Sequence, residues 1–132
     1  MEQDFEKIIA DFESETGYIL EIIDGRPYYR GDLDLQGTDI TSLPDGLTVG
    51  GGLYLEDCKG ITSLPKGLAV GGYINLRDTG ITSLPEGLTV GGGLYLRGTG
   101  ITSLPEGLTV GGGLYLRDTG ITSLPESLTV GG

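Results

Sequence analysis

Apolar residues recur along most of this chain with one fixed period. The string ITSLP begins at Ile40, Ile61, Ile81, Ile101 and Ile121, so successive copies are spaced by 21, 20, 20 and 20 residues. A constant period in this range is typical of solenoids, in which each repeat forms one coil that cannot bury its apolar face alone. We therefore expect a solenoid of about five coils over residues 31–132, with the last coil truncated.

Within one copy, the alternation of side chains predicts a short strand followed by an extended return. In the last full copy, Leu114 and Leu116 point to one side of the strand and Tyr115 points to the other. Pro125 then favours an extended, non-helical path back. We expect the strands of successive coils to form one parallel sheet, with the proline-containing segments as the returns.

The first thirty residues have a different pattern. Their apolar residues Phe5, Ile8, Ile9 and Phe12 follow the spacing i, i+3, i+4 and i+7 of an amphipathic helix. The segment 18–30 then predicts two strands joined by a turn at Asp24-Gly25. Terminal units of a solenoid must be atypical to cover its end coil, so we interpret residues 1–30 as an N-terminal cap of helix and hairpin.

The repeat L-x-L-x-x-T-x-I, followed by SLP, resembles the leucine-rich repeat with its L-x-x-L-x-L-x-x-N-x-L core. It is most similar to the short bacterial type seen in secreted effectors of enteric pathogens and in small gut-bacterial and phage proteins, although the ligase domain of some effectors has no counterpart in this sequence. The family's asparagine is replaced here by Thr38, Cys58, Thr79, Thr99 and Thr119. We expect these hydroxyl and thiol groups to donate to backbone carbonyls of the turn.

The resemblance implies an α+β repeat fold with the sheet on the concave face of the solenoid. It also implies that the chain binds another protein on that face. Because the similar proteins include phage and gut-bacterial ones, inhibition of a bacterial or host protein is the use we expect.

The composition argues against an enzyme. The 132 residues include no histidine, which is the commonest general base and metal ligand, and one cysteine, Cys58, which we expect to be buried. No nucleophile, base and orienting group can be assembled from the rest, and we expect no cofactor and no metal. The formal net charge of −11 disfavours direct binding to nucleic acid or to a membrane surface. With no recognisable signal peptide or membrane span, we expect a cytoplasmic protein.

The run GGG before several strands invites comparison with a phosphate-binding loop. Such loops lie between a strand and a helix N-terminus, and Lys with Ser or Thr usually follows them directly. The run at Gly111–Gly113 instead precedes a strand, and no lysine is near. We therefore expect these glycines to permit a tight bend and close stacking of adjacent coils.

Stacking in register places equivalent residues of successive coils in columns about 4.8 Å apart. Tyrosine and arginine columns give the strands an outer surface of the composition enriched at protein interfaces. The residues of this candidate binding face are Tyr54, Tyr73, Asn75, Arg77, Tyr95, Arg97, Tyr115 and Arg117. We expect Gly52, Gly93 and Gly113, two positions before the tyrosine column, to leave room for the partner. The alternative is that these residue types merely suit an exposed sheet face.

A second column offers a different function. Its carboxylates are Asp45, Glu86, Glu106 and Glu126, and Lys66 interrupts it. Such a row is usually a solvated face. The functional alternative is mimicry of a nucleic-acid backbone, in which the chain acts as a decoy that blocks a nucleic-acid enzyme.

The last strand predicted by the sequence has an open edge. Leu114, Leu116 and Arg117 lie on it. One interpretation is that the half-coil 121–132 and the charges of Arg117 and Asp118 shield this edge. The other is that two chains meet there as a symmetric homodimer, or that the chain self-assembles there in a purely structural role.

Overall fold

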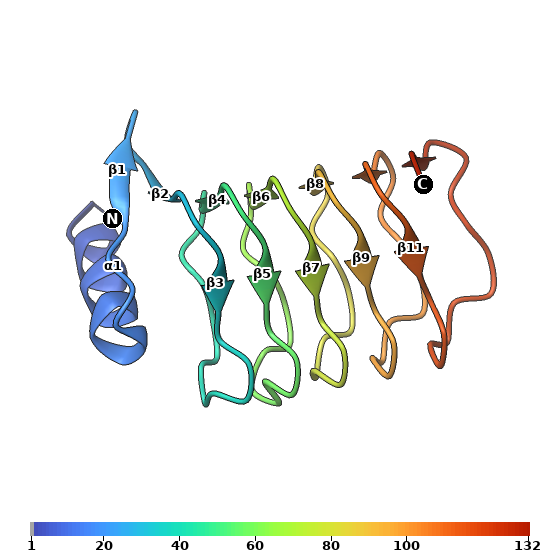
Figure 1. The fold of residues 1–132 in the computed structure, drawn as a ribbon, viewed down its shortest axis with the longest axis horizontal. Helices are drawn as coiled ribbons and strands as arrows, with labels where there is room; N and C mark the ends of the chain where they lie inside the picture. Colours follow the sequence, from blue (N-terminus) through green and yellow to red (C-terminus); the bar gives the residue numbers. More distant parts are fainter. Residues whose placement is uncertain (1) are drawn as a thin grey trace.

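The computed structural model describes residues 2–132 and shows a solenoid with a helix and a hairpin at its N-terminal end (Figure 1). Helix α1 spans Glu2–Thr16, and the hairpin consists of β1 (Glu21–Ile23) and β2 (Arg26–Tyr29). The strands of the coils are β3 (Leu33–Asp34), β4 (Thr48–Val49), β5 (Leu53–Tyr54), β6 (Ala69–Val70), β7 (Ile74–Asn75), β8 (Thr89–Val90), β9 (Leu94–Tyr95), β10 (Thr109–Val110), β11 (Leu114–Tyr115) and β12 (Thr129–Val130). The predicted solenoid of stacked parallel strands with an N-terminal helix is confirmed.

Each coil contributes a strand to each of two parallel sheets, whereas the sequence pattern suggested one. The tyrosine sheet has the order β11-β9-β7-β5-β3, and the threonine sheet has the order β1-β2-β4-β6-β8-β10-β12. The register pairs equivalent positions, such as Tyr95 with Tyr115 and Val90 with Val110. The threonine sheet forms because, in the LTV segment after each proline (LAV in the coil of β6), Leu and Val face inward and the residue between them faces outward, which is the period of a strand.

The inward side chains of the two sheets stack into one core. Leu53, Ile74 and Leu94 hold the same position in successive coils and are fully buried. Each coil therefore covers the apolar side chains of the coil before it, and a single repeat has no core of its own.

The threonine side chains close the turn after their own strand of the tyrosine sheet, whereas the cysteine side chain reaches the turn of the preceding coil. The hydroxyl of Thr99, which is 6% exposed, donates to the backbone carbonyl of Leu96 at 2.8 Å. The thiol of Cys58 is also buried and donates to the carbonyl of Leu35 in the preceding coil at 2.9 Å. The expected donation to turn carbonyls is thus present, and it adds a side-chain bond to carbonyls that already accept a backbone N–H of their own turn, from Thr99 at Leu96 and from Thr38 at Leu35.

Glycines at the corner between the sheets let neighbouring coils approach closely. A Cβ added to Gly71 would lie 2.6 Å from the carbonyl oxygen of Gly50, and one added to Gly92 would lie 2.9 Å from the carbonyl carbon of Gly72. Both separations are too short for any side chain, so the glycines are required by coil stacking. No helix follows these corners in residues 2–132, as a phosphate-binding loop would require.

The cap helix buries a narrower stripe than the sequence suggested. Ile9 and Phe12 are buried and Phe5 packs against them, which is the spacing i, i+4 and i+7. Ile8 lies at the margin of this stripe and is 48% exposed. The helix ends at Thr16, and Gly17 follows it with a positive φ of 82°, which is typical of the residue after a helix C-terminus.

The hairpin extends the threonine sheet at its N-terminal end. β1 and β2 pair antiparallel around Asp24 and Gly25, which have φ values of 53° and 78°. Two positive φ values in a two-residue turn match the twist of the flanking strands, as the Asp-Gly sequence predicted. β2 then pairs in parallel with β4, with Tyr28 opposite Thr48.

Candidate functional site

Tyrosine rings form a ladder on the outer side of the tyrosine sheet. We call Tyr54, Tyr73, Tyr95 and Tyr115 the tyrosine ladder. The rings of Tyr95 and Tyr115 are stacked with centroids 4.5 Å apart and planes 8° apart, and the centroids of Tyr73 and Tyr95 are 5.8 Å apart. Tyr73 and Tyr115 are 48% and 49% exposed. The structure therefore brings the predicted tyrosines together on one accessible surface.

The glycines before these tyrosines do not form an open slot for a partner, so that expectation was wrong. A Cβ added to Gly52 would lie 2.7 Å from the hydroxyl oxygen of Tyr54, and one added to Gly113 would lie 2.6 Å from the hydroxyl oxygen of Tyr115. Each ring thus lies along its own strand and occupies the space above the glycine. The glycines make room for the tyrosine ladder itself.

In the coil of β7, the tyrosine and the small residue exchange positions. Tyr73 stands where the neighbouring coil has Gly93, and Asn75 pairs in register with Tyr95. Asn75 uses its side-chain oxygen locally, to accept the backbone N–H of Arg77 at 3.1 Å. The rings of the other ladder tyrosines extend back over the position of the glycine two residues earlier. Tyr73 stands at that position itself, so its ring lies in the same row, and each of the coils that contain β5, β7, β9 and β11 contributes one ring to the ladder.

Exposed arginines lie two residues beyond the tyrosine column. We call Arg77, Arg97 and Arg117 the arginine row. Nε of Arg77 lies 3.4 Å from Oδ2 of Asp78, and Nε of Arg97 lies 3.4 Å from Oδ2 of Asp118. Within residues 2–132, Arg117 has no ion pair. Exposed pairs of this kind contribute at most about 1 kcal/mol, so a carboxylate on a partner can compete for the guanidinium groups.

The hydroxyls of Tyr54 and Tyr95 remain neutral hydrogen-bonding groups. Burial of the ring raises the pKa of Tyr95 above its ordinary value of 10.0, and the Tyr115 hydroxyl raises it further. Burial also raises the pKa of Tyr54, with a smaller contribution from the nearby Asp32 carboxylate. Both groups therefore keep their proton throughout the physiological range and can both donate and accept.

The residue after each arginine adopts a left-handed backbone conformation. φ is 59° at Asp78, 74° at Gly98 and 59° at Asp118. The copies 81–100 and 101–120 differ only at Gly98 and Asp118, and both residue types tolerate this conformation better than most. The difference changes the charge beside the arginine row, since Asp118 pairs with Arg97 and Gly98 cannot form such a pair.

The carboxylates of the acidic row occupy the turns that lead into the threonine sheet. Asp45, Glu86, Glu106 and Glu126 are all exposed. Oε1 of Glu106 accepts a hydrogen bond from the Ser127 hydroxyl at 2.7 Å. The row lies on a different part of the coil from the tyrosine ladder, and its role as a nucleic-acid mimic stays a prediction.

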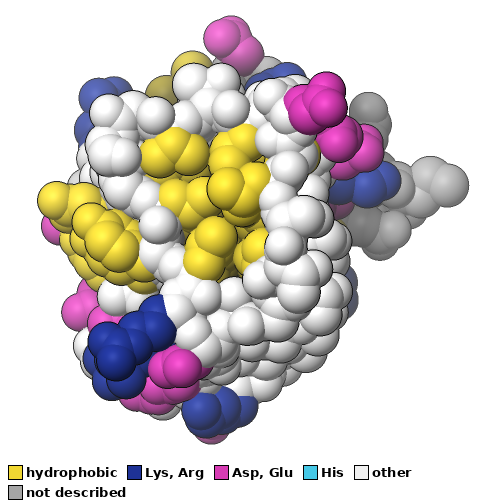
Figure 2. Space-filling model, turned by 90° about the vertical axis from the view of Figure 1, so that its right-hand side faces the viewer, with side chains coloured by type: hydrophobic (Ala, Val, Ile, Leu, Met, Phe, Trp, Pro, Cys, Tyr) yellow, Lys and Arg dark blue, Asp and Glu magenta, His cyan; other side chains and the backbone are white. Residues whose placement is uncertain are grey.

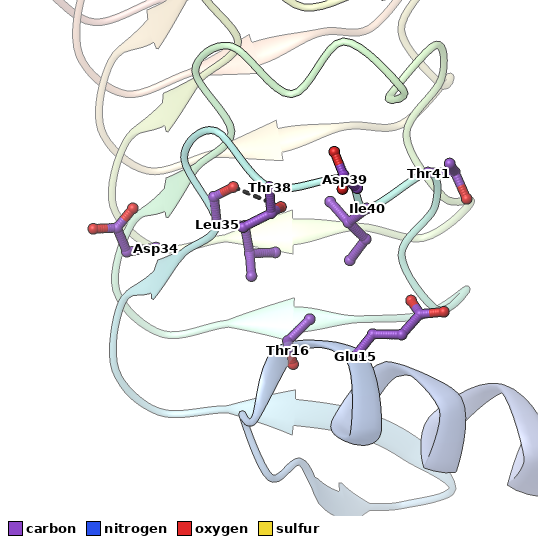
Figure 3. Close-up of a pocket in the computed structure, with 8 residues that line it drawn as sticks. All are labelled: Glu15, Thr16, Asp34, Leu35, Thr38, Asp39, Ile40 and Thr41. Carbon is purple, nitrogen blue, oxygen red and sulfur yellow. Dashed lines mark hydrogen bonds between the residues drawn. The ribbon is translucent and has the colours of Figure 1, made fainter.

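A cavity that the sequence did not signal lies where the cap meets the first coil. It has a volume of about 510 Å³ and is lined by Glu15, Thr16, Asp34, Leu35, Thr38, Asp39, Ile40 and Thr41 (Figure 3). Glu15 and Thr16 come from the end of α1 and the other residues from the first coil, where Thr38 donates to the Leu35 carbonyl at 2.8 Å. Among the side chains described, no group of three or more potential metal ligands is gathered. The cavity marks the part of the first coil that the helix leaves uncovered.

The C-terminal end of the solenoid exposes its core. Leu124 is 56% exposed and Val130 is 37% exposed, and Leu114 and Leu116 are half-buried although their counterparts in inner coils are fully buried. Figure 2 shows this end, with apolar side chains gathered at its centre and charged side chains at its rim. The predicted edge residues Leu114, Leu116 and Arg117 therefore do lie at an open edge.

The described helix is too short and too polar to cross a lipid bilayer. The structure shows a β-solenoid whose coils are about 20 residues long. No protein-family model, no curated protein and no solved structure matches the chain.

Proposed function

We propose that the chain is a non-enzymatic protein-binding module whose contact surface is the tyrosine ladder with the adjacent arginine row. The observation that carries this proposal is the row of contacting rings of Tyr73, Tyr95 and Tyr115, in which Tyr95 stacks on Tyr115 and the two outer rings are exposed, on one face beside the arginine row. Tyrosine and arginine are enriched among the residues that dominate binding energy at protein interfaces.

The order of the ladder favours binding. Tyr95 is held between Tyr73 and Tyr115, and Gly113 lets the Tyr115 ring lie against the sheet. Side chains that are already fixed in the free protein lose less conformational entropy when a partner covers them. The tyrosine hydroxyls supply hydrogen bonds, and the arginine row offers guanidinium groups to acidic side chains of the partner.

We further propose that the coils are leucine-rich repeats of the short SLP type and that the bound protein is a bacterial or host protein that the chain inhibits. The repeat spacing supports the first part, together with Thr99, whose hydroxyl donates within its own turn, and Cys58, whose thiol donates to the turn of the preceding coil. The second part follows from the resemblance to phage and gut-bacterial proteins.

The test is affinity capture with cross-linking from the cell that makes the protein. The binding-face variant combines Tyr95→Ala, Arg97→Ala, Tyr115→Ala and Arg117→Ala. Its matched control is the acidic-row variant, which combines Glu86→Gln, Glu106→Gln and Glu126→Gln. We expect the partner to be lost with the binding-face variant and kept with the control, while circular dichroism shows that both variants are folded.

The reverse result would favour the nucleic-acid decoy. In that case the acidic-row variant would lose the partner, the binding-face variant would keep it, and binding of the unmodified chain would weaken steeply with added salt. Retention of the partner by both variants would contradict both functions.

A further inference from the structure

The rings of Tyr95 and Tyr115 are held in a geometry that favours a covalent bond between them. The two residues pair in register on β9 and β11, and their rings are stacked with centroids 4.5 Å apart and planes 8° apart. Both rings lie back along parallel strands, since a Cβ added to Gly93 would lie 3.4 Å from Cζ of Tyr95 and one added to Gly113 would lie 2.6 Å from the hydroxyl oxygen of Tyr115. The two hydroxyls are therefore at the same end of the stack, and the Cε atoms beside them are neighbours.

The other tyrosine contacts within residues 2–132 have a different geometry. The rings of Tyr73 and Tyr95 are tilted by 51° with centroids 5.8 Å apart, and Tyr73 stands two positions earlier in its coil. The rings of Tyr18 and Tyr29 meet edge to face at 85°, and the Tyr18 hydroxyl is bonded to the backbone of Asp34. Neither of these pairs is a parallel stack.

We propose that Tyr95 and Tyr115 are a site of oxidative modification, at which a peroxidase acting with hydrogen peroxide joins the two rings in a dityrosine cross-link. Each hydroxyl gives up one proton and one electron, which leaves a phenoxyl radical on each ring. Hydrogen peroxide takes up the two protons and the two electrons, its O–O bond breaks, and two water molecules form. This inference does not depend on the proposed function.

The cross-link itself is a carbon–carbon bond. The unpaired electrons of the two radicals pair between one Cε of Tyr95 and one Cε of Tyr115, because a phenoxyl radical carries much of its spin on the carbons beside the oxygen. The hydrogen on each of these carbons then leaves as a proton, and a proton returns to each oxygen, so both rings regain their aromaticity and their hydroxyls. The cross-linked chain has two hydrogen atoms fewer than the starting chain.

The sheet favours this pair over other reactions of the radicals. Neighbouring strands of a sheet are about 4.8 Å apart, so the stack keeps the two rings together before either is oxidised. Groups held next to each other react as if they were at a very high concentration, whereas coupling between chains requires an encounter in solution. Tyr115 is 49% exposed, which lets an oxidant reach it and leaves the rings room to turn as the bond forms.

A cross-link at this site would fasten the coil of β9 to the coil of β11. It would close a loop of chain between residues 95 and 115, and closing such a loop lowers the entropy of the unfolded state. We therefore expect the oxidised chain to unfold at a higher temperature than the unmodified chain.

Peptide mapping after oxidation tests the proposal. Trypsin cleaves after the arginine row, so Tyr95 lies in the peptide 78–97 and Tyr115 lies in the peptide 98–117. The full chain in dilute solution is treated with a haem peroxidase and hydrogen peroxide, and dityrosine fluorescence follows the reaction. We expect a product of monomer mass, short of two hydrogen atoms, in which these two peptides are joined. Further dilution of the chain should leave its yield unchanged.

Two variants with the same chemical change give the matched comparison. Tyr115→Phe removes one hydroxyl of the stack, and we expect the joined peptides to disappear. Tyr54→Phe removes a hydroxyl from the same column in the coil of β5, and we expect the joined peptides to remain. Circular dichroism before oxidation shows that both variants are folded.

Coupling of N-acetyltyrosine in the same reaction shows that the peroxidase is active. With an active peroxidase, a chain that forms no dityrosine would overturn the proposal. So would a main product that joins the Tyr73 peptide, 67–77, to the peptide 78–97, because the tilted pair would then couple first. Cross-links between chains, with a yield that falls on dilution, would also contradict it.

Discussion

At the N-terminal end of the solenoid, residues of the cap cover the edge of both sheets. β2 pairs with β4 in the threonine sheet, and Tyr18 occupies the bonding groups of β3 in the tyrosine sheet. At the C-terminal end, β11 and β12 are the outermost strands within residues 2–132, and the core beside them is exposed. Coils of nearly the same sequence thus have buried or exposed apolar side chains according to whether further protein packs against them. The contribution of a residue to stability therefore depends on the place of its coil along the stack as well as on its type.

The largest expected difference between an inner coil and the C-terminal coil concerns the leucine of the SLP sequence. Leu104 and Leu124 hold the same position in adjacent coils, but Leu104 is 8% exposed and Leu124 is 56% exposed. We expect Leu104→Ala to lower the free energy of unfolding by about 2 to 5 kcal/mol, because it opens a cavity in a packed core. We expect Leu124→Ala to cost less than about 1 kcal/mol, because its side chain is already in solvent. Urea unfolding of both variants checks the difference.

The protein concentration must be kept low in this experiment, so that the unfolding of separate chains is measured. Equal losses for the two variants would show that the C-terminal coil is covered in solution. Repeating the experiment at high concentration then distinguishes cover by a second copy, since only that cover depends on concentration.

Removing the Tyr18 hydroxyl would leave the N-terminal edge of the tyrosine sheet uncovered, as its C-terminal edge is. Tyr18→Phe keeps the ring, which contacts Tyr29 edge-on with centroids 5.1 Å apart, but leaves the Asp34 N–H and carbonyl without partners. We expect a loss of about 0.5 to 1.5 kcal/mol, the net worth of a hydrogen bond, because both Asp34 groups are exposed and water can replace the hydroxyl. Hydrogen exchange at the Asp34 amide should accelerate locally. Tyr73→Phe, on the exposed ladder, is the control and should leave that amide protected.

The sequence predicted the features that depend on period. Five copies of ITSLP place equivalent residues in register, so the columns of Tyr95, Tyr115, Arg97 and Arg117 followed without a structure. The turn at Asp24 followed from residue types that tolerate positive φ. Both predictions succeed because they need only local rules and the assumption that identical coils stack identically.

The features that escaped prediction depend on contacts between different parts of the chain. The threonine sheet was missed because its two-residue strands are too short for the alternation in LTV to stand out beside the proline. Nothing near Tyr18 in the sequence shows that its hydroxyl will meet the backbone of Asp34, sixteen residues away. The direction of the Tyr115 ring over Gly113 depends on a rotamer, which the repeat does not specify.

The smallest expected effect is on the titration of Tyr95, which the Tyr115 hydroxyl of the next coil influences. It appears at alkaline pH. The raised pKa of Tyr95 comes first from burial of its ring and then from the Tyr115 hydroxyl on β11. Because the folded state disfavours the phenolate, Tyr95 contributes stability that is fully present below the ordinary pKa of 10.0 and is lost as pH rises through the folded pKa. The ring is only partly buried, so we expect a modest fall in the unfolding temperature above pH 10. The Tyr115→Phe variant should lower the pKa of Tyr95, so that its phenolate absorbance appears at a lower pH. The Tyr95→Phe variant shows which part of the absorbance belongs to Tyr95. If Tyr115→Phe leaves the titration of Tyr95 unchanged, the two hydroxyls do not interact in solution, and the C-terminal coil is looser than the stacked rings indicate.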